Sequence, residues 1–186
     1  MKNRLFNFVG GNTGDWRVVR IETVVGTPLA EVARVEIIEG ENDSAPENSV
    51  WRLRGVTSYE RYVTRAEKDS LIAVQEGLNR PAATCAALIP IRKSAAWWEL
   101  AQDDRRAILE TNSKHIATGL KYLPAIARRL HHSRELGEEF DFLTWFEYAP
   151  EDAGAFDELV GTLRGTEEWN YVERQVDIRL VRAERL

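Results

Sequence analysis

Two stretches of the chain repeat the same order of features. Residues 62–80 (YVTRAEKDSLIAVQEGLNR) and 148–165 (YAPEDAGAFDELVGTLRG) each begin at a tyrosine that ends a strand-like segment, continue into an amphipathic helical pattern and lead into another strand-like segment. In the second stretch, Phe156, Leu159 and Leu163 recur at helical spacing. The repeat predicts a duplicated α+β unit with antiparallel sheet.

The remaining pattern fills in both units. Short segments rich in β-branched and aromatic residues predict strands at 5–10, 16–26, 33–40, 51–56, 85–94, 139–148 and 176–181. Helical patterns occupy about 65–78, a long region from about 98 to 132, and the segment that begins at 150. We therefore expect a single domain, residues 1–186, made of two halves at about 1–83 and about 84–186.

Charge and composition exclude several classes of function. The formal net charge of −5 does not suit a nucleic-acid-binding protein. A single cysteine permits no internal disulfide and fits a reducing compartment. We read neither a signal peptide nor an apolar run long enough to span a bilayer, so the expectation is a cytoplasmic protein with no membrane partner.

His115 lies in the long helical region, and Gly119 follows it one turn later. Glycine inside a helix costs up to about 1 kcal/mol relative to alanine, so it usually has a structural reason. A missing side chain beside a histidine leaves room for a flat group, as a metal porphyrin would require. The alternative is an ordinary packed histidine beside a chance glycine, and local sequence alone favours that alternative.

Pro124 interrupts the same region. Proline removes a backbone donor and disfavours helix in the preceding residue, so the helix should kink or end near Leu123. Such a break would let Arg128 approach a bound group from the side opposite His115. Alternatively, Arg128 and Arg129 are solvent-facing charges at a helix end.

Three further polar residues need an interpretation. Gln75 lies on the apolar face of its expected helix, where it either marks a site or satisfies a buried backbone group. His131 and His132 are adjacent, and on a helix they would diverge by about 100° and could not easily share a metal. We expect both histidines to be exposed to solvent.

Taken together, these segments resemble the chlorite dismutase family. The resemblance is carried by RYVTRAE, IPIRKSAAWWELAQDDRR, NSKHIATGLKYLPAIARRLHHSRELGEEFDFLTWFE and LRGTEEWNYVERQVDIRLVR, in the family's order, over most of the chain from residue 50 onward. The first 50 residues match only in general character. The resemblance implies two ferredoxin-like halves in a dimeric α/β-barrel type of domain, and a homodimer for short chains of this kind.

The resemblance also implies a role for each matching position. His115 is similar to the proximal ligand of haem b, Glu168 to the acid that hydrogen-bonds it, and Lys93 to the lysine paired with that acid, with Glu167 a competing candidate for the acid. Arg128 is similar to the distal arginine that acts on substrate. The other implied contacts of the haem or its distal pocket are Tyr62, Trp97, Trp98, Gly119, Gln75 and Leu123.

The implied reaction converts chlorite to chloride and O2, with Arg128 holding the reactive fragment close until the O–O bond forms. Coprohaem decarboxylases and dye-decolourising peroxidases are alternatives within the same superfamily. Arg128 argues against the first, and the lack of a matching aspartate segment argues against the second. A haem-binding or dimeric α/β-barrel protein without catalytic activity is a further alternative.

Overall fold

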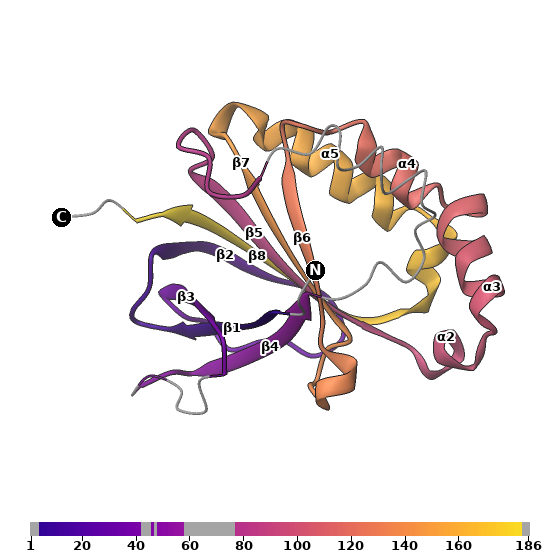
Figure 1. The fold of residues 1–186 in the computed structure, drawn as a ribbon, viewed down its shortest axis with the longest axis horizontal. Coiled ribbons are helices and arrows are strands. Elements are labelled where there is room, and N and C mark those ends of the chain that lie inside the picture. The colour runs from indigo at the N-terminus through magenta and orange to yellow at the C-terminus, as the bar shows by residue number, and fades with distance from the viewer. Residues whose placement is uncertain (1–3, 42–45, 47, 58–76, 184–186) are drawn as a thin grey trace.

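The computed structural model of the chain describes residues 4–41, 46, 48–57 and 77–183. Most of the helix expected at about 65–78 lies outside these residues. Tyr62 and Gln75 also lie outside them. Strands of the described part pair antiparallel and close into a barrel (Figure 1). The strands are β1 (Arg4–Gly11), β2 (Trp16–Val25), β3 (Arg34–Glu39), β4 (Trp51–Thr57), β5 (Cys85–Lys93), β6 (Ala127–His132), β7 (Phe142–Tyr148) and β8 (Val172–Arg182).

The order of the strands around the barrel reflects the duplication. It runs β1-β3-β2-β8-β5-β7-β6-β4 and returns to β1. Each half contributes four neighbouring strands, and they are arranged in the same order. The order β4-β1-β3-β2 in the first half corresponds to β8-β5-β7-β6 in the second. The expected α+β architecture with antiparallel, ferredoxin-like halves is confirmed, while the boundary near residues 83 and 84 stays a prediction.

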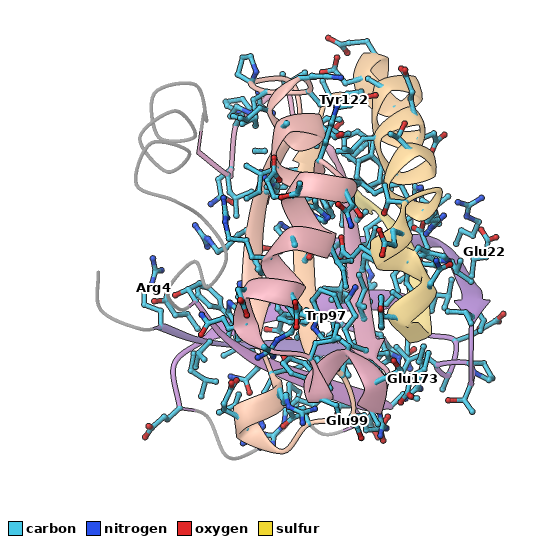
Figure 2. All side chains as sticks on the ribbon, turned by 90° about the vertical axis from the view of Figure 1, so that its right-hand side faces the viewer. Arg4, Glu22, Trp97, Glu99, Tyr122 and Glu173 are labelled. Carbon is cyan, nitrogen blue, oxygen red and sulfur yellow. The ribbon has the colours of Figure 1, made fainter. Side chains whose placement is uncertain are left out.

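Helices gather on the outer face of the second half, where α4 and α5 lie side by side (Figures 1 and 2). The helical elements are α2 (Ala95–Glu99), α3 (Gln102–Arg106), the π-helix η1 (Ala107–Asn112), α4 (His115–Leu120), the 3-10 helices η2 (Arg134–Leu136), η3 (Pro150–Asp152) and η4 (Glu167–Tyr171), and α5 (Ala153–Arg164). As the apolar spacing predicts, Phe156, Leu159 and Val160 of α5 are buried against the strands. Among the described residues, no helix is both long and apolar enough to cross a membrane.

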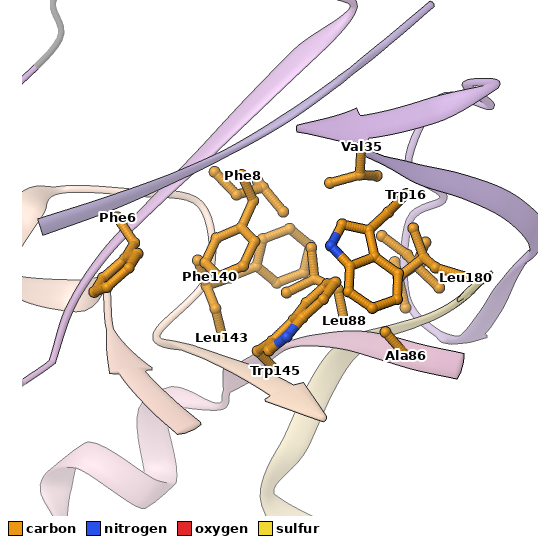
Figure 3. Packing of buried hydrophobic residues seen from close by; sticks show 13 residues of the cluster. Phe6, Phe8, Trp16, Val35, Ala86, Leu88, Phe140, Leu143, Trp145 and Leu180 are labelled. Atoms are coloured by element: carbon orange, nitrogen blue, oxygen red, sulfur yellow. The ribbon is translucent and has the colours of Figure 1, made fainter. Parts of the chain in front are cut away.

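The interior of the barrel holds an aromatic core (Figure 3). Trp145 of β7 packs edge-on against Trp16 of β2, with ring centroids 5.1 Å apart, and tilts against Phe8 of β1 at 5.8 Å. Because successive residues of a strand point to opposite faces, Phe146 lies on the outer face and packs on Phe156 of α5. The sheet thus separates the aromatic core from a second apolar layer beneath the helices.

The expectation of helix up to residue 132 is wrong, because residues 127–132 form β6. The chain reverses after α4 through the cis peptide bond between Leu123 and Pro124, and β6 then pairs with β7 along its whole length. The helix does end before Leu123, as the proline predicts. Arg128 therefore lies on a strand, not on a helix that continues past the proline.

The same strand overturns the expectation that His131 and His132 are exposed. Both are buried, at 1% and 4% exposure. His131 points into the barrel, where its ring meets Phe6 and Phe8 edge-on at 5.1 Å each, and its Nδ1 lies 3.1 Å from the Leu143 carbonyl oxygen. A carbonyl only accepts, so Nδ1 carries the proton in this bond. Burial lowers the pKa of His131 to about 4, which keeps the imidazole neutral.

The long helical region is also less continuous than its periodicity suggests. The π-helix η1 ends at Asn112, and Lys114 takes a left-handed conformation with φ 51° and ψ 37° before α4 begins at His115. A left-handed residue breaks the helical repeat, so His115 does not share one unbroken face with the residues of η1. His115 instead opens a new short helix.

Candidate active site around His115

His115 is held by a carboxylate from a distant part of the chain. Its Nδ1 lies 2.7 Å from Oε2 of Glu168, which is carried by η4. The neighbouring Glu167 turns elsewhere and accepts a hydrogen bond from the exposed Asn112 side chain at 2.8 Å. Of the two acids that the sequence left open, Glu168 is therefore the one that contacts the histidine.

Lys93 completes a three-residue chain behind His115. It ends β5, its side chain is only 4% exposed, and its Nζ donates to Oε1 of Glu168 at 2.7 Å. The same Nζ also donates to the main-chain oxygen of Glu168 at 3.3 Å. Each carboxylate oxygen of Glu168 thus has one partner, with Lys93 on one and His115 on the other.

The electrostatics of this chain keep Glu168 ionised. Burial alone would raise its pKa, but the charge and hydrogen bond of His115, together with those of Lys93, outweigh burial and lower the pKa to about 2. An ionised carboxylate is a strong acceptor for an imidazole N–H. His115 is therefore oriented with Nδ1 toward the acid, which leaves Nε2 as the ring nitrogen available to another group.

A metal at His115 would need ligands from a source other than nearby side chains. In the part of the chain that the structure describes, no group of three or more His, Cys, Asp or Glu residues could hold a metal ion. One oriented imidazole suits a metal whose remaining ligands belong to a cofactor. Haem iron is held in this way by a proximal histidine.

The tandem tryptophans of α2 contact different residues. Trp97 is buried beneath Lys93, whose Nζ lies 4.7 Å from the ring centroid, and packs on Tyr171 of η4 at 5.4 Å. Trp98 stacks on Phe142 of β7, and the guanidinium of Arg134 lies 4.0 Å from its ring centroid. Trp97 thus supports the Lys93–Glu168 pair, and Figure 2 labels it at the lower end of the helices.

Arg128 lies on the outer face of β6, beneath α4. A Cβ added to Gly119 would stand 2.3 Å from Nη1 of Arg128, so the guanidinium packs directly against the backbone of α4. Burial lowers the pKa of Arg128, although an arginine stays charged in proteins. The sequence predicts space for a flat group beside Gly119. In the structure, the Arg128 guanidinium lies in that space, where it contacts the helix of His115. Leu123 is half-buried in the turn that joins α4 to β6.

The sequence reasoning missed Asp141, which ties several of these parts together. Its Oδ2 accepts the main-chain N–H of Lys93 at 2.7 Å and the indole N–H of Trp98 at 3.3 Å, and its Oδ1 accepts from Arg134 at 3.2 Å. Asp141 lies just before β7 in a segment that reads as one aromatic strand. An acid placed between two aromatic residues, Phe140 and Phe142, was the available signal, because a buried carboxylate needs partners.

The chain is similar to known chlorite dismutases. The family model described as chlorite dismutase matches residues 43–183. A chlorite dismutase of Ideonella dechloratans is 32% identical over 121 residues, which cover 64% of this chain. The matched part spans only 40% of the length of that relative.

Solved structures extend the likeness over nearly the whole chain. The structure of dimeric chlorite dismutases from Nitrobacter winogradskyi shares 59% identity with a TM-score of 0.89, covering 96% of this chain and 99% of that one. A mutant chlorite dismutase of Candidatus Nitrospira defluvii, at 21% identity and a TM-score of 0.71 over 97% and 91% of the two chains, shares the fold. The family model alone matches well over half of the residues, and the chain belongs to the chlorite dismutase family.

Proposed function

We propose that this protein binds haem b through His115 and converts chlorite to chloride and O2. The observation that carries the proposal is the chain of contacts from Lys93 through Glu168 to Nδ1 of His115, with bonds of 2.7 Å at both steps. It turns Nδ1 of the imidazole toward Glu168, which leaves Nε2 available to iron. Membership of the chlorite dismutase family and the 59% identity to a dimeric member support the assignment.

The residues around His115 fit a haem. A porphyrin brings four nitrogen ligands of its own, so a single oriented imidazole is a sufficient protein donor. Gly119 presents bare backbone one turn after His115, and the nearest atoms to a Cβ built there belong to the guanidinium end of Arg128. Leu130, two residues beyond Arg128 on the same strand, is 43% exposed and offers apolar surface that a porphyrin can cover.

Lys93 and Glu168 set the character of the imidazole. An N–H donated to an ionised carboxylate makes the imidazole a stronger electron donor through its other nitrogen. Lys93 keeps the carboxylate ionised by its own charge. When bound, the haem supplies the redox chemistry, and this donor set favours its ferric and higher oxidation states.

Arg128 provides the binding charge for the substrate. Chlorite is a small anion, and a guanidinium offers it a permanent positive charge and several N–H donors. Because a guanidinium does not release a proton, it would hold the anionic hypochlorite-level fragment in the site without protonating it. Confinement by Arg128 then favours O–O bond formation over escape of the fragment.

Assembly and location follow the same reasoning. The related structure at 59% identity is described as dimeric, which supports a homodimer for this chain. A cytoplasmic location stays a prediction from the sequence.

An oxygen electrode tests the proposed function. Haemin-loaded protein given chlorite should release O2 and chloride in equal amounts, and His115→Ala should lose both the haem absorbance and the O2. Peroxidase activity without O2 release from chlorite would favour a peroxidase of the same superfamily. Failure of the unaltered chain to take up haemin would contradict the assignment of His115 as iron ligand.

A further inference from the structure

Ser113 connects the segment that carries His115 to the acid that contacts it. Ser113 is buried at 6% exposure, and its Oγ accepts the main-chain N–H of Glu168 at 3.1 Å. His115, two residues later, meets the carboxylate of the same Glu168. One turn of chain therefore holds Glu168 at two points, by its backbone and by its side chain.

The N–H of Glu168 needs this partner. Glu168 is the second residue of the 3-10 helix η4, and the first N–H groups of a helix have no acceptor within it. The next N–H, that of Trp169, already donates to the Thr166 carbonyl. Ser113 thus satisfies a buried donor and fixes where η4 begins relative to α4.

The chain conformation around Ser113 supports a positioning role. Lys114 adopts the left-handed conformation, which is unfavourable for a residue with a side chain. The carboxylate of Glu110 accepts the N–H of Ile116 at 2.8 Å and that of Ala117 at 3.4 Å, so the start of α4 is capped from the preceding π-helix. The left-handed Lys114 and the cap from Glu110 thus fix the short segment between Ser113 and His115. Both the Ser113 hydroxyl and the His115 ring contact Glu168 from this segment.

We propose that Ser113 is a positioning residue, whose bond to the Glu168 backbone sets the length and angle of the His115–Glu168 hydrogen bond. The inference rests on the proposed role of His115 as iron ligand. Without the Ser113 hydroxyl, the backbone of Glu168 would keep its bond from Lys93 to the carbonyl oxygen but lose the partner of its N–H. The carboxylate would then draw back from Nδ1, and the imidazole would be a weaker donor to iron.

Matched variants isolate this bond. Ser113→Ala removes the acceptor with little change in volume, and Ser113→Thr restores a hydroxyl. Asn112→Ala removes the adjacent, exposed bond to Glu167, which joins the same two segments but does not touch Glu168. A general loosening of η4 would therefore affect Asn112→Ala and Ser113→Ala alike.

The decisive readout is the iron–histidine stretching band of the reduced, haem-loaded full-length protein, measured by resonance Raman spectroscopy. Ser113→Ala should shift this band to lower frequency and weaken haemin affinity roughly tenfold, while Ser113→Thr and Asn112→Ala should stay near the unaltered protein. An unshifted band in Ser113→Ala, or an equal shift in Asn112→Ala, would overturn the proposal.

A second measurement separates this proposal from the proposed function. In the full-length chain as purified without haemin, the imidazole ¹⁵N spectrum reports the Nδ1–H bond of His115, identified by its loss in His115→Ala. Ser113→Ala should weaken that bond, and Ser113→Thr should restore it. Failure of the unaltered chain to take up haemin would contradict the proposed function only. An unchanged imidazole signal in Ser113→Ala would contradict the positioning role of Ser113, whether or not haemin binds.

Discussion

The guanidinium of Arg128 on β6 lies directly before Gly119 on α4, so close that a Cβ on Gly119 would stand 2.3 Å from Nη1. The contact joins the helix of His115 to the strand that faces it. It also means that a flat group can lie against Gly119 only when the end of the Arg128 side chain turns aside. A flexible side-chain end turns at small cost, whereas a methyl group on α4 would be a permanent obstruction.

Gly119→Ala should therefore weaken haemin binding without unfolding the protein. Alanine gains up to about 1 kcal/mol in a helix interior, which offsets much of the displacement of Arg128. The expected result is a free energy of unfolding within about 1 kcal/mol of the unaltered protein, with clearly lower haemin affinity by titration. Gly161→Ala in α5 is the matched control, since a Cβ there meets nothing within 4 Å. Equal haemin affinity in the two variants would contradict the role of Gly119.

Glu168→Gln should alter stability in a defined acid window. The pKa of Glu168 falls from 4.5 when unfolded to about 2 when folded, so the unfolded chain binds more protons between these values. The carboxylate stabilises the fold above pH 4.5, and this contribution is lost as pH falls toward 2, at about 1.4 kcal/mol per pKa unit. Denaturant unfolding should show a stability deficit of Glu168→Gln above pH 4.5 that narrows below it. A deficit independent of pH would mean that the charge of Glu168 does not contribute.

Arg128→Ala should retain haem but release more of the hypochlorite-level fragment before the O–O bond forms. Without the guanidinium, more hypochlorite should escape and the haem absorbance should bleach in fewer turnovers, as trapping of hypochlorite by a chlorinatable dye would show. Arg129→Ala is the control, because Arg129 points to the other face of β6, with its guanidinium 5.3 Å from the Phe6 ring. Full activity of Arg128→Ala with no added bleaching would exclude the proposed role.

His131 should make the fold sensitive to mild acid. Its pKa is lowered from 6.5 to about 4, chiefly by burial, so the unfolded chain binds more protons between pH 6.5 and 4. Stability is therefore complete above pH 6.5 and declines as pH falls toward 4, with a slope of at most about 1.4 kcal/mol per pH unit from this group. His131→Gln should flatten the stability profile between pH 7 and 4.5. An unchanged slope would assign the acid sensitivity to other groups.

The sequence predicted most of the sheet because its strands have a strong local signature. Alternation and β-branched residues located β1 to β4 within one or two residues, and the apolar spacing of Phe156, Leu159 and Val160 located α5. The order of strands around the barrel depends on pairing between distant segments, and only the faint repeat indicated it.

Errors arose where local preference and tertiary pairing compete. Residues 127–132 contain no strong strand formers, and pairing with β7 decides their conformation. The expectation that His131 and His132 are exposed is wrong for the same reason, because it assumes a helix where the chain forms β6. The contact of Glu168 with His115 spans 53 residues, and no spacing rule reaches that far. The pairing of His115 with an acid was implied only by the family resemblance. Spacing alone could not decide whether that acid is Glu167 or Glu168.

The two halves of the barrel meet along two very unequal seams. Between β2 and β8 the pairing runs from Trp16 opposite Arg182 to Val25 opposite Gln175, whereas β4 and β6 share only Val56 opposite His132 among the described residues. The barrel is thus closed by a long seam between β2 and β8 and by a short seam between β4 and β6. β6, the strand of Arg128, forms one side of the short seam, so the residue proposed to bind substrate lies on the strand that joins the two halves through the fewest described pairs.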